Sequence, residues 1–268
     1  MYHSITLGDK NTWDDWGLVS KDRPFIAPPK PKTNFIDIPG SSVKLDFSEG
    51  LTGYPTYENR TGSIEFTITD QYISNREKVW VSKFSEIQNY ISGRKLQMIL
   101  EDDPDYFYEG RFSVDTYKPG SSASESYSTI TIGYDVGPYK WSVEDSIRGT
   151  WEWDPFSFVD GVIVSSYVKN IPVKTTEQYK DLPKEIIGDV PFVPEFMVST
   201  NTTGAIITIR VVNERLKINT THQVQSGNHI FYDSVFWADA LTDSKTRIYY
   251  KVNTGTGTLS LKYRKGGF

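Results

Sequence analysis

Four acidic side chains lie within five residues, at Glu101, Asp102, Asp103 and Asp105, with Pro104 among them. Carboxylate oxygens in such a run could hold a calcium ion. The EF-hand pattern is absent, because the run has neither the central glycine nor the final bidentate glutamate of that loop. Aspartate and proline also favour turns, so we interpret the run as an acidic turn between two strands.

Carboxylate pairs also serve glycoside hydrolysis, which needs two acids at a defined separation, one of them with a raised pKa. The chain has 34 acidic residues, and nothing in the sequence marks one pair among them. We therefore assign no catalytic carboxylate.

Histidine occurs at three positions, His3, His222 and His229, and cysteine is absent. His222 and His229 lie seven residues apart across a predicted hairpin and could approach each other. Neither stands in an HExxH or triad setting, and the sequence has no Gly-x-Ser-x-Gly elbow and no phosphate-binding glycine pattern. The absence of cysteine excludes disulfides, zinc–thiolate sites and thiol catalysis. The sequence thus predicts no catalytic residue, no metal site, no cofactor and no enzyme.

Trp151 and Trp153 are two residues apart, so on an extended segment their rings face the same way, and Phe156 and Phe158 follow. Such a platform could stack on the face of a sugar. Large aromatic side chains are usually buried, so a core or a contact between subunits is the preferred interpretation.

The composition favours a β-rich protein. Of 268 residues, 37% are hydrophobic and 14% aromatic, a balance in which aromatic and β-branched side chains suit strands. The net charge is −5 and no run of five like charges occurs, so we predict no specific nucleic-acid binding and no membrane-binding patch. The first residues have no apolar signal-peptide core, and no apolar segment of about 18 residues could cross a bilayer. We expect synthesis in the cytoplasm.

Period-two alternation of apolar and polar residues predicts strands in both halves of the chain. In the first half, the apolar positions of these strands are Ile64, Phe66 and Ile68, then Leu96, Met98 and Leu100, then Ile130, Ile132 and Tyr134. In the second half they are Ile207, Ile209 and Val211, then Ile248, Tyr250 and Val252, then Leu259, Leu261 and Tyr263.

One segment has a helical pattern instead. Trp80, Phe84, Ile87 and Ile91 fall at spacings of four, three and four, the apolar stripe of an amphipathic helix. Ser74 with Glu77 fits a capping box, and Gly93 supplies a left-handed stop. The pattern predicts one long α-helix over about 75–92.

A domain boundary is expected just after the segment 137–141, because a proline-rich stretch with short, interrupted strands follows it. The predicted domains are 1–143 and 144–268. The fold class is mainly β, with two β-sandwich-type domains, the first carrying the long helix.

Short motifs follow one another in a fixed order between Ser4 and Trp141. They include Trp-Asp-Asp-Trp at 13–16, Leu-Thr-Gly-Tyr-Pro-Thr-Tyr-Glu-Asn-Arg at 51–60 and Tyr-Asp-Val-Gly-Pro-Tyr-Lys-Trp at 134–141. In this order they resemble the distal tail (Dit) proteins of long-tailed, siphovirus-type phages or prophages of Gram-positive bacteria. The residues that carry the resemblance are Trp13, Trp16, Gly53, Tyr54, Asn59, Arg60, Pro138 and Trp141. As side chains, the aromatic ones suit a core, and Arg60 is either a surface charge or a planar set of donors that holds a neighbouring segment.

The resemblance implies a virion structural protein at the tail tip, in the hub of the baseplate. In that family six copies of the N-terminal domain form a ring around a channel, and a galectin-like β-sandwich lies outside it. The implied partners are other copies of the chain, the major tail tube protein, a tail-associated fibre or lysin protein and receptor-binding proteins. For the ring contacts we expect the N-terminal segment and a hairpin over Tyr106–Val114. The second half matches only in pattern, so the galectin-like domain is an analogy.

The alternative hypothesis is a carbohydrate-binding module, either galectin-like or of the type attached to carbohydrate-active proteins. It would recognise a host cell-wall polysaccharide through Trp151 and Trp153. The two hypotheses are compatible if an outer domain keeps a sugar site.

Overall fold

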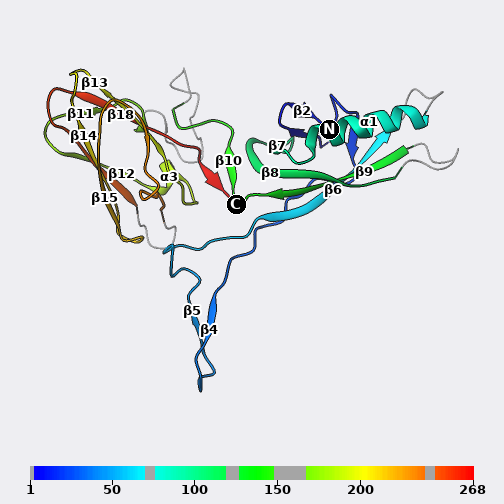
Figure 1. The fold of residues 1–268 in the computed structure, drawn as a ribbon, viewed down its shortest axis with the longest axis horizontal. Helices are drawn as coiled ribbons and strands as arrows, with labels where there is room; N and C mark the ends of the chain where they lie inside the picture. The colour runs from blue at the N-terminus through cyan, green and yellow to red at the C-terminus, as the bar shows by residue number, and fades with distance from the viewer. Residues whose placement is uncertain (1–2, 70–75, 119–126, 148–166, 239–244) are drawn as a thin grey trace. The chain divides into compact units, whose positions relative to one another are not determined.

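The computed structural model describes residues 3–69, 76–118, 127–147, 167–238 and 245–268. Contacts divide the chain into two compact units, whose elements are labelled in Figure 1. The first unit comprises Met1–Thr33, Thr56–Val143 and Phe268, and the second comprises Asn34–Pro55 and Glu144–Gly267. Residues 34–55 thus belong by their contacts to the second unit, although they interrupt the first in sequence. The predicted domains, 1–143 and 144–268, stay a prediction.

The strands of the first unit pair antiparallel in one sheet with the order β2-β1-β7-β8-β9-β6-β3, and β10 pairs with β8. Their bounds are β1 Ile5–Leu7, β2 Lys10–Asn11, β3 Leu18–Ser20, β6 Arg60–Thr69, β7 Lys95–Leu100, β8 Asp103–Lys118, β9 Tyr127–Val136 and β10 Lys140–Ser142. The register shifts between Val114 and Thr116 where β8 pairs with β9. Such a bulge bends the strands.

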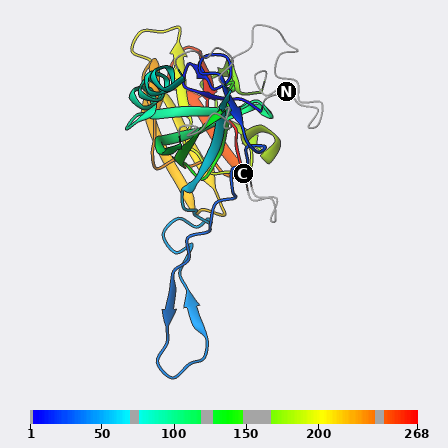
Figure 2. The same ribbon diagram turned by 90° about the vertical axis from the view of Figure 1, so that its right-hand side faces the viewer.

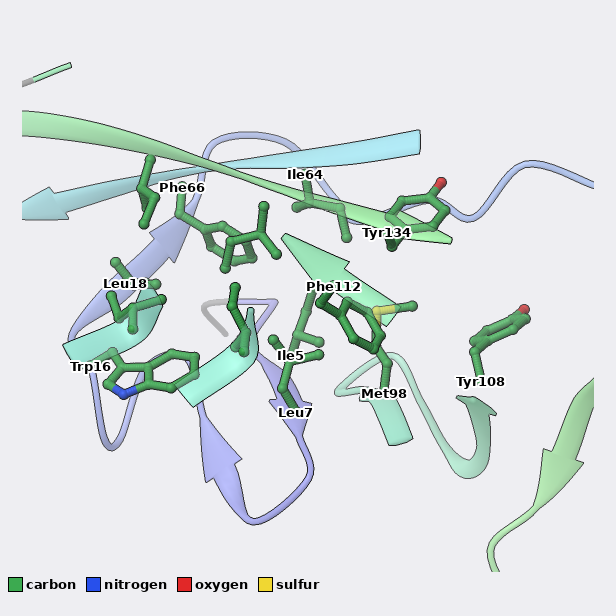
Figure 3. Close-up of a cluster of buried hydrophobic side chains, with 14 of the residues drawn as sticks. Ile5, Leu7, Trp16, Leu18, Ile64, Phe66, Met98, Tyr108, Phe112 and Tyr134 are labelled. Carbon is green, nitrogen blue, oxygen red and sulfur yellow. The ribbon is translucent and has the colours of Figure 1, made fainter. Parts of the chain in front are cut away.

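The core of the first unit lies between two layers of this one sheet. Figure 3 shows Ile64 and Phe66 of β6 pointing toward Ile5 and Leu7 of β1, with Met98 of β7 beside them. Along β6, Ile64, Phe66 and Ile68 are buried while Glu65 and Thr67 between them are partly exposed, as the period-two pattern predicts. The predicted β-sandwich-type domain is confirmed, and its two layers come from a continuous sheet.

The predicted helix is also confirmed, as α1 (Arg76–Ile91). Ile87 and Ile91 are fully buried in the same core, and Phe84 packs against it. Gly93 has φ of 76°, the left-handed conformation that ends a helix without steric strain. Ser74 of the predicted capping box lies outside the described residues.

Contacts of Tyr90 and Lys83 attach α1 to the N-terminal segment, and Lys83 Nζ donates to the Asp15 carbonyl (3.0 Å). The rings of Trp16 and Tyr90 meet edge to face, with centroids 5.6 Å apart. The Tyr90 hydroxyl donates to the Leu7 carbonyl (3.1 Å) and accepts from the Asp9 backbone N–H (3.1 Å). The helix is therefore held by a buried aromatic contact with a polar contact at its rim.

The second unit contains two four-stranded antiparallel sheets, ordered β11-β18-β13-β16 and β12-β17-β14-β15. Their bounds are β11 Ile171–Val173, β12 Gln178–Leu182, β13 Glu195–Thr200, β14 Ile207–Asn213, β15 Ile218–Val224, β16 Gly227–Ile230, β17 Thr246–Val252 and β18 Gly257–Lys262. The unit also has the short helix α3 (Lys184–Ile187) and the two-residue strand β19 (Gly266–Gly267). Along β14, Ile207, Ile209 and Val211 are buried while the residues between them are partly exposed. This alternation in both sheets is that of a β-sandwich.

A separate two-stranded hairpin lies within residues 34–55 (Figure 2). It consists of β4 (Phe35–Asp37) and β5 (Lys44–Asp46), which pair with each other and with no other described strand. The turn between them contains Pro39 and Gly40, and the Ser41 N–H donates to the Ile38 carbonyl (3.0 Å). Gly40 has φ of 80°, which the third position of a Pro-Gly type II turn requires.

The Trp16 contact predicts a large stability difference between two nearby tryptophans. Trp16 is 1% exposed, so Trp16→Ala should lower the free energy of unfolding by about 3–5 kcal/mol. Trp13 is only half-buried, so Trp13→Ala should cost less than half as much. Chemical denaturation followed by fluorescence and circular dichroism measures both. If the two variants lost the same free energy of unfolding, burial of Trp16 against α1 would not be the source of this stability.

Candidate functional site

The acidic run 101–105 forms a turn whose carboxylates face different partners. Asp102 accepts from Arg23 Nε (2.9 Å) and contacts His3 Nδ1 (3.0 Å). Glu101 accepts the Ser4 backbone N–H (2.7 Å), and Asp103 pairs with Lys140 Nζ (2.7 Å). Among the described residues, no group of three or more His, Cys, Asp or Glu could hold a metal ion. The run therefore ties the N-terminal segment and β10 to the turn between β7 and β8.

Asp102 is the charged centre of this turn. Burial alone would raise the pKa of its carboxyl group, but hydrogen bonds from Arg23 and His3 outweigh burial, and the pKa lies below its ordinary value. The ionised form of Asp102 is thus favoured in the folded chain.

His222 and His229 both lie near the Phe231 ring, as their spacing allowed. The His222 ring stacks on Phe231 with centroids 3.8 Å apart, and the His229 ring is 6.2 Å away. His222 Nε2 is 3.1 Å from both Ser234 Oγ and Asp233 Oδ1. A catalytic triad uses the two ring nitrogens for different partners. Here the hydroxyl and the carboxylate meet the same nitrogen, and Ser234 is fully buried, so the group is not arranged for nucleophilic attack.

The interior of the first unit contains a small apolar cavity. Its volume is about 10 Å³, and Ile5, Phe66, Met98 and Phe112 are among its apolar lining residues. That volume corresponds to about one water molecule, which is too small for a substrate.

Asn59 and Arg60 join the start of β6 to the end of β9. Asn59 Nδ2 donates to Asp135 Oδ1 (2.8 Å), and Arg60 Nε donates to the Pro138 carbonyl (2.9 Å). Arg60 Nη1 also donates to the Ala27 carbonyl (3.3 Å). Sequence alone left Arg60 as either a surface charge or a clamp, and its geometry is that of a clamp.

The Arg60 guanidinium is buried, with 5% of the residue exposed. Its Nη2 atom is buried and has no hydrogen-bond partner, while the guanidinium carbon lies 5.2 Å from the centre of the Tyr108 ring. Burial lowers the pKa of Arg60. A charge in this position is held by two carbonyl oxygens and an aromatic face.

The other residues of the resemblance are distributed over both units. Trp16 supports α1, while Trp141 lies opposite Phe107 of β8. Gly53 has φ of 75°, and the Tyr54 ring lies 5.8 Å from Trp237 within the second unit. The eight residues therefore do not form one site, and a structural role for each stays a prediction. Trp151 and Trp153 lie outside the described residues.

The hairpin β4–β5 presents an apolar face without a covering element in the described chain. Side chains alternate across each strand, and Ile36 lies directly opposite Leu45. Continuing the alternation, this apolar hairpin face consists of Ile36, Ile38, Val43, Leu45 and Phe47. All five are exposed, Val43 to 71%, and Leu51 beyond the hairpin is 103% exposed. The opposite face carries Asp37 and Lys44, which form an ion pair (3.1 Å), together with Asp46 and the exposed Phe35.

Exposed apolar side chains of this density usually mark a binding surface. An isolated two-stranded hairpin is at best marginally stable in water, and its outer edges leave backbone N–H and C=O groups open to pairing. The hairpin is therefore the best candidate for an assembly contact in the described chain.

No hairpin forms over Tyr106–Val114, because these residues lie within the single strand β8; their part in ring contacts stays a prediction. Residues 107–111 of this segment pair with β7 and residues 110–114 pair with β9, so the segment is part of the sheet. Gly110 lies where a Cβ atom would be 2.1 Å from the Asp135 carbonyl oxygen. This glycine serves close strand approach and not a turn.

No helix among the described residues has both the length and the apolar character needed to span a membrane. A scan against protein-family models and a search of curated proteins give no match. Among solved structures, the chain is similar to the crystal structure of the SPP1 Dit (gp 19.1) protein, described as a paradigm of the hub adsorption apparatus in phages that infect Gram-positive bacteria. The likeness covers 100% of each chain, with a TM-score of 0.58 and 9% sequence identity.

This chain has a Dit-like fold. The resemblance predicted from the motifs of the first half is thereby confirmed at the level of the fold, and it extends over the second half. Within the Dit-like fold, the Asn59–Arg60 clamp and the Trp16–Tyr90 contact hold the scaffold, and the hairpin is an extension of it.

Loss of the Arg60 clamp should destabilise the first unit. Arg60→Ala removes two charge-assisted hydrogen bonds in a buried place, so we expect a loss of about 2–4 kcal/mol in the free energy of unfolding. Arg111→Ala is the matched control, because Arg111 is exposed and donates to the Gly93 carbonyl, and it should cost less than about 1 kcal/mol. Denaturant titration measures both variants. An Arg60→Ala loss no larger than the control would contradict the clamp.

The lowered pKa of Asp102 predicts acid sensitivity. The pKa of an unfolded aspartate is about 3.9, so the ionised carboxylate stabilises the fold above that pH, and this contribution disappears as pH falls through the lower, folded-state pKa. The stability advantage of the wild type over Asp102→Asn should therefore be full at pH 6 and shrink between roughly pH 5 and pH 2. Unfolding free energies measured across this range would run parallel for the two proteins if the interaction were unimportant.

Proposed function

We propose that the protein is a structural component of a phage tail tip, the distal tail ring at the end of the tail tube. The observation that carries this proposal is the likeness to the SPP1 Dit protein over the whole length of both chains. The role is structural and not enzymatic, in keeping with side chains such as Asp102 and Arg60 that bind neighbouring segments of their own chain.

The hairpin supports self-assembly. Its apolar face is as rich in large side chains as a buried strand pair. In an isolated copy of the chain this face stays in water, which is unfavourable in hydrophobic free energy. A contact in which the hairpin of one copy covers a different surface of the next copy is head-to-tail. Such contacts close into a ring when each step turns by a fixed fraction of a circle.

The Dit resemblance favours six copies around a central channel. On this proposal the ring joins the major tail tube protein to a tail-associated fibre or lysin protein, with receptor-binding proteins at the periphery, in the tail tip of the virion. The first domain would form the ring, and the second would be a galectin-like sandwich outside it.

The apolar hairpin face predicts how assembly can be broken. Light scattering of the purified chain should give an oligomer, and negative-stain images should show rings with an open centre. The double variant Ile36→Ser with Leu45→Ser should shift the protein to monomers, because it removes the central apolar pair of that face.

The matched control changes the opposite face of the same two strands. Asp37→Ser with Lys44→Ser removes an exposed ion pair, which contributes little, and should leave the oligomer intact. A wild type that stays monomeric at high concentration would count against the ring. Loss of assembly in both double variants would instead show that the hairpin acts through its own folding.

A further inference from the structure

The sheet β12-β17-β14-β15 has an outward face made of aromatic and basic side chains, which we call the outer sheet face. Its side chains align in rows across the strands. One row is Tyr179, Tyr249, Arg210 and Thr221, in that order of strand pairing. The next row begins with Asp181 opposite Arg247. The inward side chains between these rows, such as Ile248, belong to the core.

Tyr179 is the most exposed ring of this face, at 62%, and it is held in place. The Arg247 guanidinium carbon lies 4.8 Å from the centre of the Tyr179 ring. Arg247 is fixed in turn by Asp181, which accepts from Nε (2.5 Å) and Nη2 (3.0 Å). The hydrogen bonds from Arg247 lower the pKa of Asp181. Two parallel N–H···O contacts define the orientation of both groups, so Tyr179 is a preorganised platform.

Arg210 extends the platform across the sheet. Its guanidinium carbon lies 4.0 Å from the centre of the Tyr249 ring, and Tyr249 is 5.9 Å from Tyr179. Arg210 Nη2 is 3.5 Å from Glu177 Oε2, a longer contact than the Arg247–Asp181 pair. A guanidinium stacked on a ring keeps its N–H edge available for a ligand.

The charge of the outer sheet face is opposite to that of the whole chain. Its basic side chains are Arg210, Lys245, Arg247 and the exposed Lys251, against the carboxylates Glu177 and Asp181. The chain as a whole has a net charge of −5. A local positive excess on an acidic protein attracts anionic ligands.

We propose that the outer sheet face binds a polysaccharide whose sugar rings carry carboxylate groups. The exposed Tyr179 ring would stack on the apolar face of a sugar, while Arg210 and Lys251 would bind its carboxylates. Thr208, Thr221 and Gln223, whose side chains alternate onto this face, would bind hydroxyl groups. Sugar binding at this face would not require the ring, and it would use residues other than Trp151 and Trp153.

The composition of the face favours a sugar chain over a protein partner. The core of a protein interface is depleted in lysine, aspartate and glutamate, whereas this face carries Lys245, Lys251, Asp181 and Glu177. Among the described residues of β14, β15 and β17 whose side chains point to the outer sheet face, Val212 is the one aliphatic residue. A flat row of rings and polar donors suits a ligand that is itself flat and hydroxylated.

Calorimetry with a defined oligogalacturonide tests the proposal. The wild type should bind it, should bind a neutral maltooligosaccharide of equal length at least about tenfold more weakly, and should lose affinity as salt is added. Tyr179→Ala should weaken binding by about tenfold or more, and Tyr179→Phe should retain it, since the stacking ring is kept. Lys251→Ala should weaken binding and reduce its salt dependence.

Tyr232→Ala is the matched control, because Tyr232 is 81% exposed in the second unit and lies outside this face; its affinity should equal that of the wild type. Binding should persist in the Ile36→Ser/Leu45→Ser variant, which separates this result from the test of ring formation. Absence of binding to the oligogalacturonide would overturn the proposal. So would equal affinity for poly-L-glutamate, which has charge without sugar rings, or equal effects of Tyr179→Ala and Tyr232→Ala.

Discussion

The antiparallel ladder between β6 and β9 is the interaction on which the first unit depends. It runs without a break from Arg60 opposite Val136 to Thr69 opposite Tyr127. A slip of one residue would turn every side chain of a strand to the other face. This register places Ile64 and Phe66 in the core. At the end where the ladder begins, Asn59 binds Asp135 and Arg60 binds the Pro138 carbonyl, so polar contacts fix the same alignment that the apolar side chains favour.

Much of this arrangement could be read from the sequence, because each strand buries only one face. Period-two alternation located the strands that contain Ile64, Ile130 and Ile207, and the four-three-four spacing located α1. The sequence did not predict which alternating segments have no other element packed on their apolar face. Residues 43–47 alternate like any half-buried strand, yet among the described residues β5 pairs with β4 alone. Burial of a strand is decided by its neighbours in space, which one sequence does not specify.

The candidate sites differ in predictability for the same reason. The acidic run was expected to be a turn, but its partners Arg23, His3 and Lys140 come from distant segments. Gly110 is a turn signal by composition, and only the position of the Asp135 carbonyl shows that it serves close strand approach. The rows of the outer sheet face combine β12, β14, β15 and β17, whose order differs from their order along the chain. Pairing of strands distant in sequence brings Tyr179, Tyr249 and Arg210 together.

The second unit is built from two separate stretches of the chain, and this limits how related genes can exchange it by recombination. By their contacts, residues 34–55 belong to the same unit as residues 144–267, and Phe268 belongs to the first unit. Tyr54 meets Trp237, and Gly53 meets Leu216. A single crossover between two related genes near codon 143 would therefore combine a hairpin from one parent with a sandwich from the other. Exchange of the second unit as a whole would need several junctions, so the hairpin and the sandwich are expected to be inherited as matched partners.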